Sequence, residues 1–157
     1  ARRVSAPTSV RAAMPSGLFI EGWAVYAEEL LARSGYAVDA ERGQAFRLVQ
    51  LKMQLRMILN TILEIGVHVE GMTEPQGRRL LSTRGYQQEG EVSGKWRRAQ
   101  LTYGQLPTYY LGYRGVADVV RDLAKQRSGW GLRQVHDSVL AHGSVSPQHL
   151  RGLVGLD

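Results

Sequence analysis

The sequence contains no cysteine, and no apolar run approaches the roughly 20 residues that a membrane-spanning helix needs. The lack of cysteine excludes disulfides, thiolate metal ligands and a cysteine nucleophile. Any bound metal must therefore be held by His, Asp or Glu. No signal peptide is visible, so we expect a soluble protein without a membrane span, either cytoplasmic or exported.

The 157 residues suit one domain, and the net charge of +6 raises the question of an anionic partner. The basic residues, however, are scattered along the whole chain. The densest groups, Arg2-Arg3, Arg78-Arg79 and Lys95 with Arg97-Arg98, are short. The pattern favours a solvated basic surface, and nucleic acid is not an expected partner.

Helical periodicity covers nearly every segment, and no alternating strand pattern is visible. We therefore predict an all-α fold: one domain over residues 1–157, a single bundle of about seven helices, two of them long, with residues 1–16 irregular. The predicted helices are Leu18–Ser34, Asp39–Val69, Thr73–Gly85, Gln88–Leu101, Pro107–Gln126, Leu132–Ala141 and a last helix that begins at Pro147 with Ser146 as its cap.

The segment 21–30, EGWAVYAEEL, opens with a carboxylate and continues with aromatic and small apolar residues. This composition predicts a rigid helix that holds Glu21 toward a functional site, and we interpret Glu21 as a metal ligand. Glu28 lies seven residues further on and shares the same helix face. It is a candidate for supporting the ligand or for acting as an alternative one.

Polar residues recur every four positions in the predicted helix over residues 39–69, which is otherwise apolar. They are Arg56, Asn60, Glu64 and His68. Four residues advance a helix by only about 40° beyond one turn, so these side chains form one ridge. The ridge is either a solvent-facing stripe with pairs such as Arg56–Glu64, or a buried set of mutually hydrogen-bonded groups. If buried, His68 oriented by Glu64 is a competent proton or hydrogen-bond donor.

A second polar group lies at the start of the predicted helix over residues 107–126. Its members are Tyr109, Tyr110, Tyr113 and Arg114. Phenol hydroxyls can stabilise an oxyanion, and arginine can hold a carboxylate. Gly112 and Gly115 would each weaken the helix by about 1 kcal/mol relative to alanine. We therefore expect a close approach to another backbone or to a ligand there.

Two other conspicuous sites receive structural interpretations. His136 and Asp137 are adjacent, and adjacent helical residues point about 100° apart, which indicates a capping or surface role rather than a catalytic pair. Trp96 lies among basic residues, and we interpret it as a core anchor flanked by solvated charges.

Four segments together resemble a known family. They read FIEGWAVYAEEL, RMILNTILEIGVHVEGMT, GKWRRAQLTYGQLPTYYLGYRG and VHDSVLAHGSVSPQHLRGLV. In this order, from about Ser9 to Val154, they resemble the C-terminal half of the bacterial family called domain of unknown function 885. That family is similar to gluzincin-type zinc metallopeptidases, which bind zinc through two histidines and a glutamate from a later helix.

The resemblance implies roles for five candidate residues. Glu21 corresponds to the third zinc ligand, His68 to a catalytic histidine near the substrate, and Tyr110, Tyr113 and Arg114 to groups facing the scissile carbonyl or the terminal carboxylate of the substrate. From the residues themselves we assign Tyr109 to substrate binding and expect Glu64, Asn60, Arg56 and Glu28 to support the site. The implied fold is half of a helical zincin peptidase, and the implied substrate is peptide-like.

The family's histidine pair lies in a segment of the form His-Glu-x-x-Pro-Gly-His, and none of the four histidines here has that context. We therefore expect a C-terminal fragment of a zinc-dependent hydrolase that is inactive alone and binds no zinc tightly, or a natural short relative that has lost catalysis. Such a fragment would pair with a missing N-terminal half or self-associate. The alternative is a non-catalytic helical binding module for an anionic partner.

Overall fold

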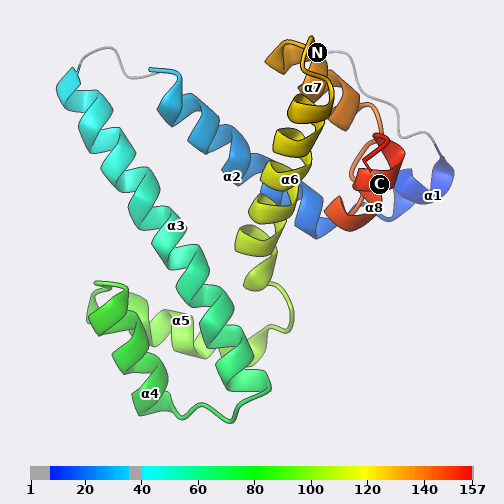
Figure 1. Cartoon of the computed structure of the whole chain (residues 1–157). Coiled ribbons are helices and arrows are strands. Elements are labelled where there is room, and N and C mark those ends of the chain that lie inside the picture. Colours follow the sequence, from blue (N-terminus) through cyan, green and yellow to red (C-terminus); the bar gives the residue numbers. More distant parts are fainter. Residues whose placement is uncertain (1–7, 36–39, 157) are drawn as a thin grey trace. The chain divides into compact units, whose positions relative to one another are not determined.

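The computed structural model describes residues 8–35 and 40–156, and every regular element among them is helical (Figure 1). The helices are α1 (Ser9–Ala13), α2 (Gly17–Arg33), α3 (Ala40–His68), α4 (Glu74–Arg79), the π-helical turn η1 (Leu80–Arg84), α5 (Glu89–Leu101), α6 (Pro107–Gln126), α7 (Leu132–Leu140) and α8 (Pro147–Leu153). The prediction of an all-α fold is confirmed. None of the helices in these ranges is long and apolar enough to cross a membrane.

The predicted helix boundaries agree closely with the observed ones, because capping residues mark them. Gly35, just beyond α2, has a φ of +76°, which an L residue with a side chain rarely adopts. Before α4, the side chain of Gln76 accepts a hydrogen bond from the Thr73 backbone N–H at 2.9 Å. The segment expected to be irregular contains α1, whereas residues 1–7 and Asp39 lie outside the described residues.

The chain divides into two compact units, which are described separately. The first consists of Ala1–Ala27 and Leu111–Asp157, and the second of Glu28–Tyr110. α2 begins in the first unit and ends in the second, whereas α6 begins in the second and ends in the first. That residues 1–157 form one domain stays a prediction.

The core of the first unit is built mainly on one face of α6. Val116, Val119, Val120 and Leu123 recur at the helical spacing of three and four residues and are buried. They pack with Phe19 of α2 and with buried residues from α7 and the C-terminal segment. Those residues are Val135, Val139, Leu150, Val154 and Leu156.

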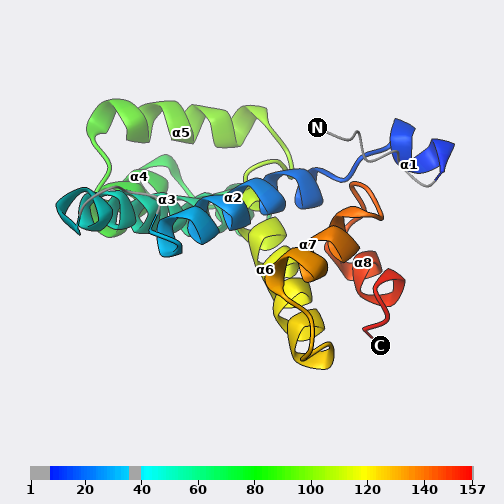
Figure 2. The same cartoon turned by 90° about the horizontal axis from the view of Figure 1, so that it is seen from above.

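The core of the second unit joins the second half of α3 to η1, α5 and the segment that follows α5. Its buried members are Leu59, Leu63, Leu81, Val92, Trp96, Ala99 and Leu106. Trp96 is 7% exposed, so its interpretation as a core anchor is confirmed. α5 lies along α3 (Figure 2).

Candidate functional site

The four polar residues of α3, here called the polar ridge, lie in the second unit. They are Arg56, Asn60, Glu64 and His68. Nη2 of Arg56 donates to both carboxylate oxygens of Glu91 at 2.5 and 2.7 Å. Lys95 Nζ donates to Oδ1 of Asn60 at 3.0 Å. The residue four positions further along α3 bonds to the residue four positions further along α5, so the two helices run in the same direction.

This pairing differs from both interpretations of the ridge that the sequence left open. The ridge is neither a solvent-facing stripe nor a set of mutually bonded groups, because its hydrogen bonds go to α5 and to the segment after it. Each ridge residue has at least one hydrogen-bond partner in α5 or in the segment after it. The ridge therefore sets the register of α5 on α3.

His68 is held by backbone carbonyls at the end of α5. Its Nε2 lies 2.8 Å from the carbonyl oxygen of Ala99 and 3.0 Å from that of Thr102. Carbonyl oxygens only accept hydrogen bonds, so Nε2 carries a proton. The ring meets Tyr103 edge to face, with centroids 5.1 Å apart. A hydrogen bond from His68 to any other group must therefore use Nδ1.

Glu64 is buried, with only 5% of its surface exposed. One carboxylate oxygen, Oε1, accepts a hydrogen bond from the backbone N–H of Gly104. The other, Oε2, has no hydrogen-bond partner among the described residues. The contacts that hold His68 come from Ala99 and Thr102, whereas Glu64 fixes the loop after α5. Glu64 thus retains one buried oxygen able to accept a hydrogen bond.

Lys95 is a member of this group that sequence reasoning missed. Burial lowers the pKa of its ammonium group, and the neighbouring Arg56 guanidinium lowers the pKa further. The spacing of four between Glu91 and Lys95 matches the spacing between Arg56 and Asn60. That match could have revealed the pairing, but only if α5 were already known to lie along α3.

In the first unit, α2 and α6 touch backbone to backbone at two glycines. A Cβ added to Gly22 would lie 2.2 Å from the carbonyl carbon of Gly112, and one added to Gly112 would lie 2.1 Å from the carbonyl oxygen of Leu18. The predicted close approach at Gly112 is confirmed. Glu21 precedes one contact glycine and Tyr113 follows the other, and both side chains are half-buried. The contact therefore brings the helix of Glu21 to the helix of Tyr113.

The other predicted glycine contact and the neighbouring arginine lie on the same helix. A Cβ added to Gly115 would lie 2.7 Å from Cβ of Pro147. The absence of a side chain at Gly115 therefore leaves room for Pro147 at the start of α8. The side chain of Arg114 is 54% exposed and lies 3.7 Å from the Asp118 carboxylate. Arg114 is thus accessible to a further anion.

Aromatic residues anchor the part of α2 that carries Glu21. Trp23 lies between Phe19 and Tyr26, with ring centroids 6.1 and 5.6 Å away. His136 of α7 meets Trp23 edge to face at 5.4 Å, and its Nε2 lies 2.9 Å from the hydroxyl oxygen of Tyr26. The predicted rigidity of this segment thus has a physical cause in aromatic packing.

His136 itself differs from its prediction. It is half-buried against Trp23 and Tyr26 rather than a surface or capping residue, whereas Asp137 is exposed. Burial lowers the pKa of His136, and the Asp137 carboxylate opposes this shift only in part. The sequence prediction compared His136 only with its neighbour Asp137. It missed the cluster because the aromatic partners of His136 are more than 100 residues away in sequence.

The candidate residues are divided between the two units. Glu21, Tyr113 and Arg114 belong to the first, whereas the polar ridge, Tyr109, Tyr110 and Glu28 belong to the second. Tyr109 and Tyr110 are half-buried at the start of α6, and Glu28 is exposed. The buried carboxylate at this end of α2 is Glu29, which contacts Arg33 at 2.6 Å.

Glu21 is the metal ligand expected from the sequence, with Glu28 as the alternative. Zinc sites normally use three or four protein ligands. Among residues 8–35 and 40–156, no three His, Asp or Glu side chains gather closely enough to hold a metal ion together. The described residues therefore do not fit zinc by themselves, and a zinc site containing Glu21 needs ligands from another segment.

Comparison with known proteins gives a family and one structural relative. No curated protein matches the chain. A solved structure described as "a putative lipoprotein of unknown function" from Shewanella oneidensis superposes with a TM-score of 0.82 at 36% sequence identity. The match covers 94% of this chain but 27% of that protein, so the chain spans about a quarter of its relative's length. Residues 1–154 match the family described as "Bacterial protein of unknown function (DUF885)", and the chain belongs to this family.

Proposed function

We propose that this chain is the C-terminal part of a longer zinc-dependent hydrolase that acts on peptides or related amides. In this proposal Glu21 is the third protein ligand of zinc, and the remaining ligands come from residues outside the 157. The chain alone then binds no zinc tightly and has no hydrolase activity.

One observation supports the proposal above the others: the glycine contact between α2 and α6. Glu21 and Tyr113 are the chain neighbours of the two glycines at which the backbones touch. Backbone contact leaves little freedom for either helix to move. Metal ligands and oxyanion donors need such fixed supports, because small displacements weaken their interaction with the reacting atoms.

The other candidates receive roles consistent with their surroundings. His68 donates to the substrate from Nδ1 in its doubly protonated form, because Nε2–H stays on the α5 carbonyls, and Tyr110 assists it. Arg114, with its exposed guanidinium, and Tyr109 bind the substrate, and Glu64, Asn60 and Arg56 fix the helix that carries His68. Glu28 supports α2.

Zinc stoichiometry of a longer protein that contains these residues tests the proposal. We expect Glu21→Gln to remove tightly bound zinc and hydrolysis together, because an amide is a far weaker zinc ligand than a carboxylate. Glu70→Gln, an exposed change just after α3 at a residue with no role in the proposed site, is the matched control and should keep both. Tight zinc binding by the 157-residue chain alone, or full zinc content in the Glu21→Gln protein, would refute the proposal.

A second variant examines His68 separately from the metal. Removing one hydrogen-bond donor to an oxyanion typically costs about 3 kcal/mol, or roughly a hundredfold in kcat. We therefore expect His68→Ala to lower kcat with zinc content unchanged. A change in KM alone would instead indicate that His68 only helps to bind the substrate.

A further inference from the structure

α3 carries a second apolar face that lies largely outside the core of its unit, although Leu55 packs against that core. This face, here called the α3 seam, consists of Leu48, Leu51, Leu55, Ile58, Ile62 and Ile65. The spacings alternate between three and four residues, as in helices that pack lengthwise against another helix. The core instead uses Leu59 and Leu63, which lie to one side of the seam.

Much of the seam is open to solvent. Leu48 is 69% exposed, and Leu51, Ile62 and Ile65 are 43–44% exposed. Leu55 and Ile58, at the centre, are half-buried. An apolar stripe this long on one helix marks an interaction face, because scattered exposed residues do not follow a helical repeat.

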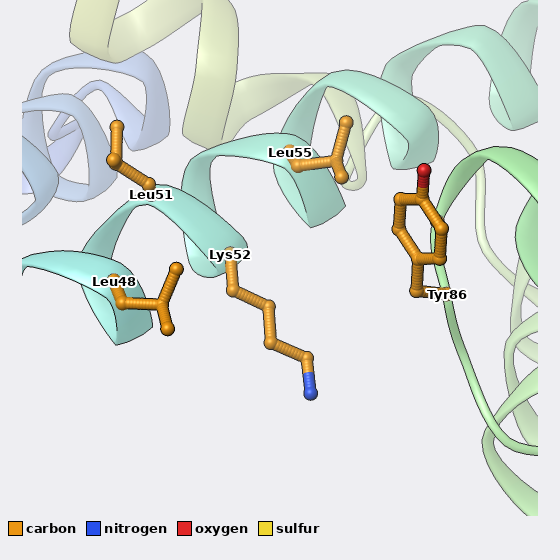
Figure 3. Close-up of a pocket in the computed structure, with 6 residues that line it drawn as sticks. Leu48, Leu51, Lys52, Leu55 and Tyr86 are labelled. Atoms are coloured by element: carbon orange, nitrogen blue, oxygen red, sulfur yellow. The ribbon is translucent and has the colours of Figure 1, made fainter. Parts of the chain in front are cut away.

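The N-terminal half of the seam borders a pocket of about 410 Å³ (Figure 3). Leu48, Leu51 and Leu55 line it from α3, and Tyr86 stands across from Leu55. Tyr86 has a φ of +51°, unusual for a residue with a bulky side chain, and it is 78% exposed. The pocket is thus suited to an apolar side chain that projects from a second helix.

The basic residues near the seam indicate what kind of helix could bind there. From residue 42 to residue 63 the chain contains four basic residues and no acidic one. Two of the four already face a carboxylate: Arg56 pairs with Glu91, and Arg47 lies 4.0 Å from Glu29. Lys52 lines the pocket beside the seam, and Arg47 precedes Leu48. A second copy of the chain would bring the same basic stretch and the same net charge of +6 to this face. An acidic helix complements the face instead.

We propose that the α3 seam is the docking face for an amphipathic helix with an apolar three-four repeat flanked by Asp and Glu. The helix comes from the part of a longer protein that lies outside the 157 residues. The related solved structure supports this source, because the chain matches 27% of that protein. The inference rests on the proposed function only in assuming a longer protein, and it requires neither zinc nor catalysis.

Synthetic helical peptides of three heptads test the docking face on the 157-residue chain. One peptide has leucine at the repeat positions and glutamate beside them, and a matched peptide has lysine in place of glutamate. We expect the acidic peptide to bind at least about tenfold more tightly, with an affinity that falls as salt rises. Fluorescence anisotropy of the labelled peptides measures both affinities.

Point variants then locate the binding face. Leu48→Gln and Ile62→Gln, on the seam, should each weaken binding of the acidic peptide by about tenfold. Val49→Gln is the matched control, because Val49 is apolar and 57% exposed but lies off the seam. Circular dichroism checks that each variant keeps its helix content.

Three results would overturn the inference: no binding of the acidic peptide, equal binding of both peptides, or equal weakening by Val49→Gln. A dimer that dissociates when Ile62→Gln is introduced, seen by sedimentation, would also overturn it and assign the seam to a second copy. None of these measurements involves zinc or hydrolysis. Failure here is therefore distinguishable from failure of the proposed function.

Discussion

Individual side chains in this protein take their properties from partners that are distant in sequence. His136 is an example: its neighbour Asp137 is exposed, but its ring packs with Trp23 and Tyr26 from the other end of the chain. Its Nε2 also lies 2.9 Å from the Tyr26 hydroxyl oxygen, within hydrogen-bond distance. Burial therefore favours the uncharged ring.

This environment predicts a pH dependence of stability. Because folding lowers the pKa of His136, the unfolded chain takes up the proton first as pH falls. The stability contribution is complete above the unfolded pKa of about 6.5 and is lost as pH falls from there toward the folded pKa. Urea unfolding of the protein and of His136→Gln across this range measures the effect, and the variant should show a smaller loss.

His149→Gln is the control for this measurement, because His149 is exposed on α8. Its pH dependence should follow that of the unsubstituted protein. Identical pH profiles for the unsubstituted protein and His136→Gln would show that the buried histidine does not contribute.

At the scale of helices, glycine decides how closely two elements approach. Gly112 lies within α6, where alanine would favour the helix by about 1 kcal/mol. The carbonyl oxygen of Leu18, however, would lie 2.1 Å from the new Cβ. A backbone atom cannot yield as a flexible side chain does, so α2 and α6 would have to separate.

We therefore expect Gly112→Ala to destabilise the protein by about 1–3 kcal/mol, as overpacking of well-packed cores does. Gly94→Ala in α5 is the matched control, because nothing lies within 4 Å of its added Cβ. That change should be neutral or stabilising by up to about 1 kcal/mol. Chemical unfolding measures both, and equal effects of the two changes would contradict the proposed backbone contact.

At the scale of the whole molecule, ion pairs engage several arginines of this basic protein. Arg78 pairs with Glu74 and Glu89, and Arg121 and Arg151 both pair with Asp122. A guanidinium group that is paired with a carboxylate offers less to a phosphate. The positive charge is therefore weaker as a binding surface than the net value of +6 suggests.

This pairing bears on the alternative function, a non-catalytic module for an anionic partner. We expect the chain to bind duplex DNA no more tightly than about 1 µM at physiological salt, the range of non-specific binding. Anisotropy titrations with labelled DNA at several salt concentrations measure this. Submicromolar affinity that persists as salt rises would favour the alternative over the proposed hydrolase.

Most helix boundaries could be predicted, because their determinants are local. Gly35 supplies a left-handed φ after α2, and Pro147 follows Ser146 at the start of α8. The polar ridge was also visible, since a period of four residues is a property of one helix. Its partners, Glu91 and Lys95, were not predicted, because no local pattern states which helix packs beside α3.

By itself, the sequence determined the all-helical fold, the ends of the helices and the need for close contact at Gly112, because capping, periodicity and the cost of glycine act within a few residues. Only the tertiary structure decided that Gly22 meets Gly112, that His68 binds the end of α5, and that His136 joins the aromatic residues of α2. These contacts join residues far apart in sequence. They depend on which surfaces pack together, and that choice is made by the fold as a whole.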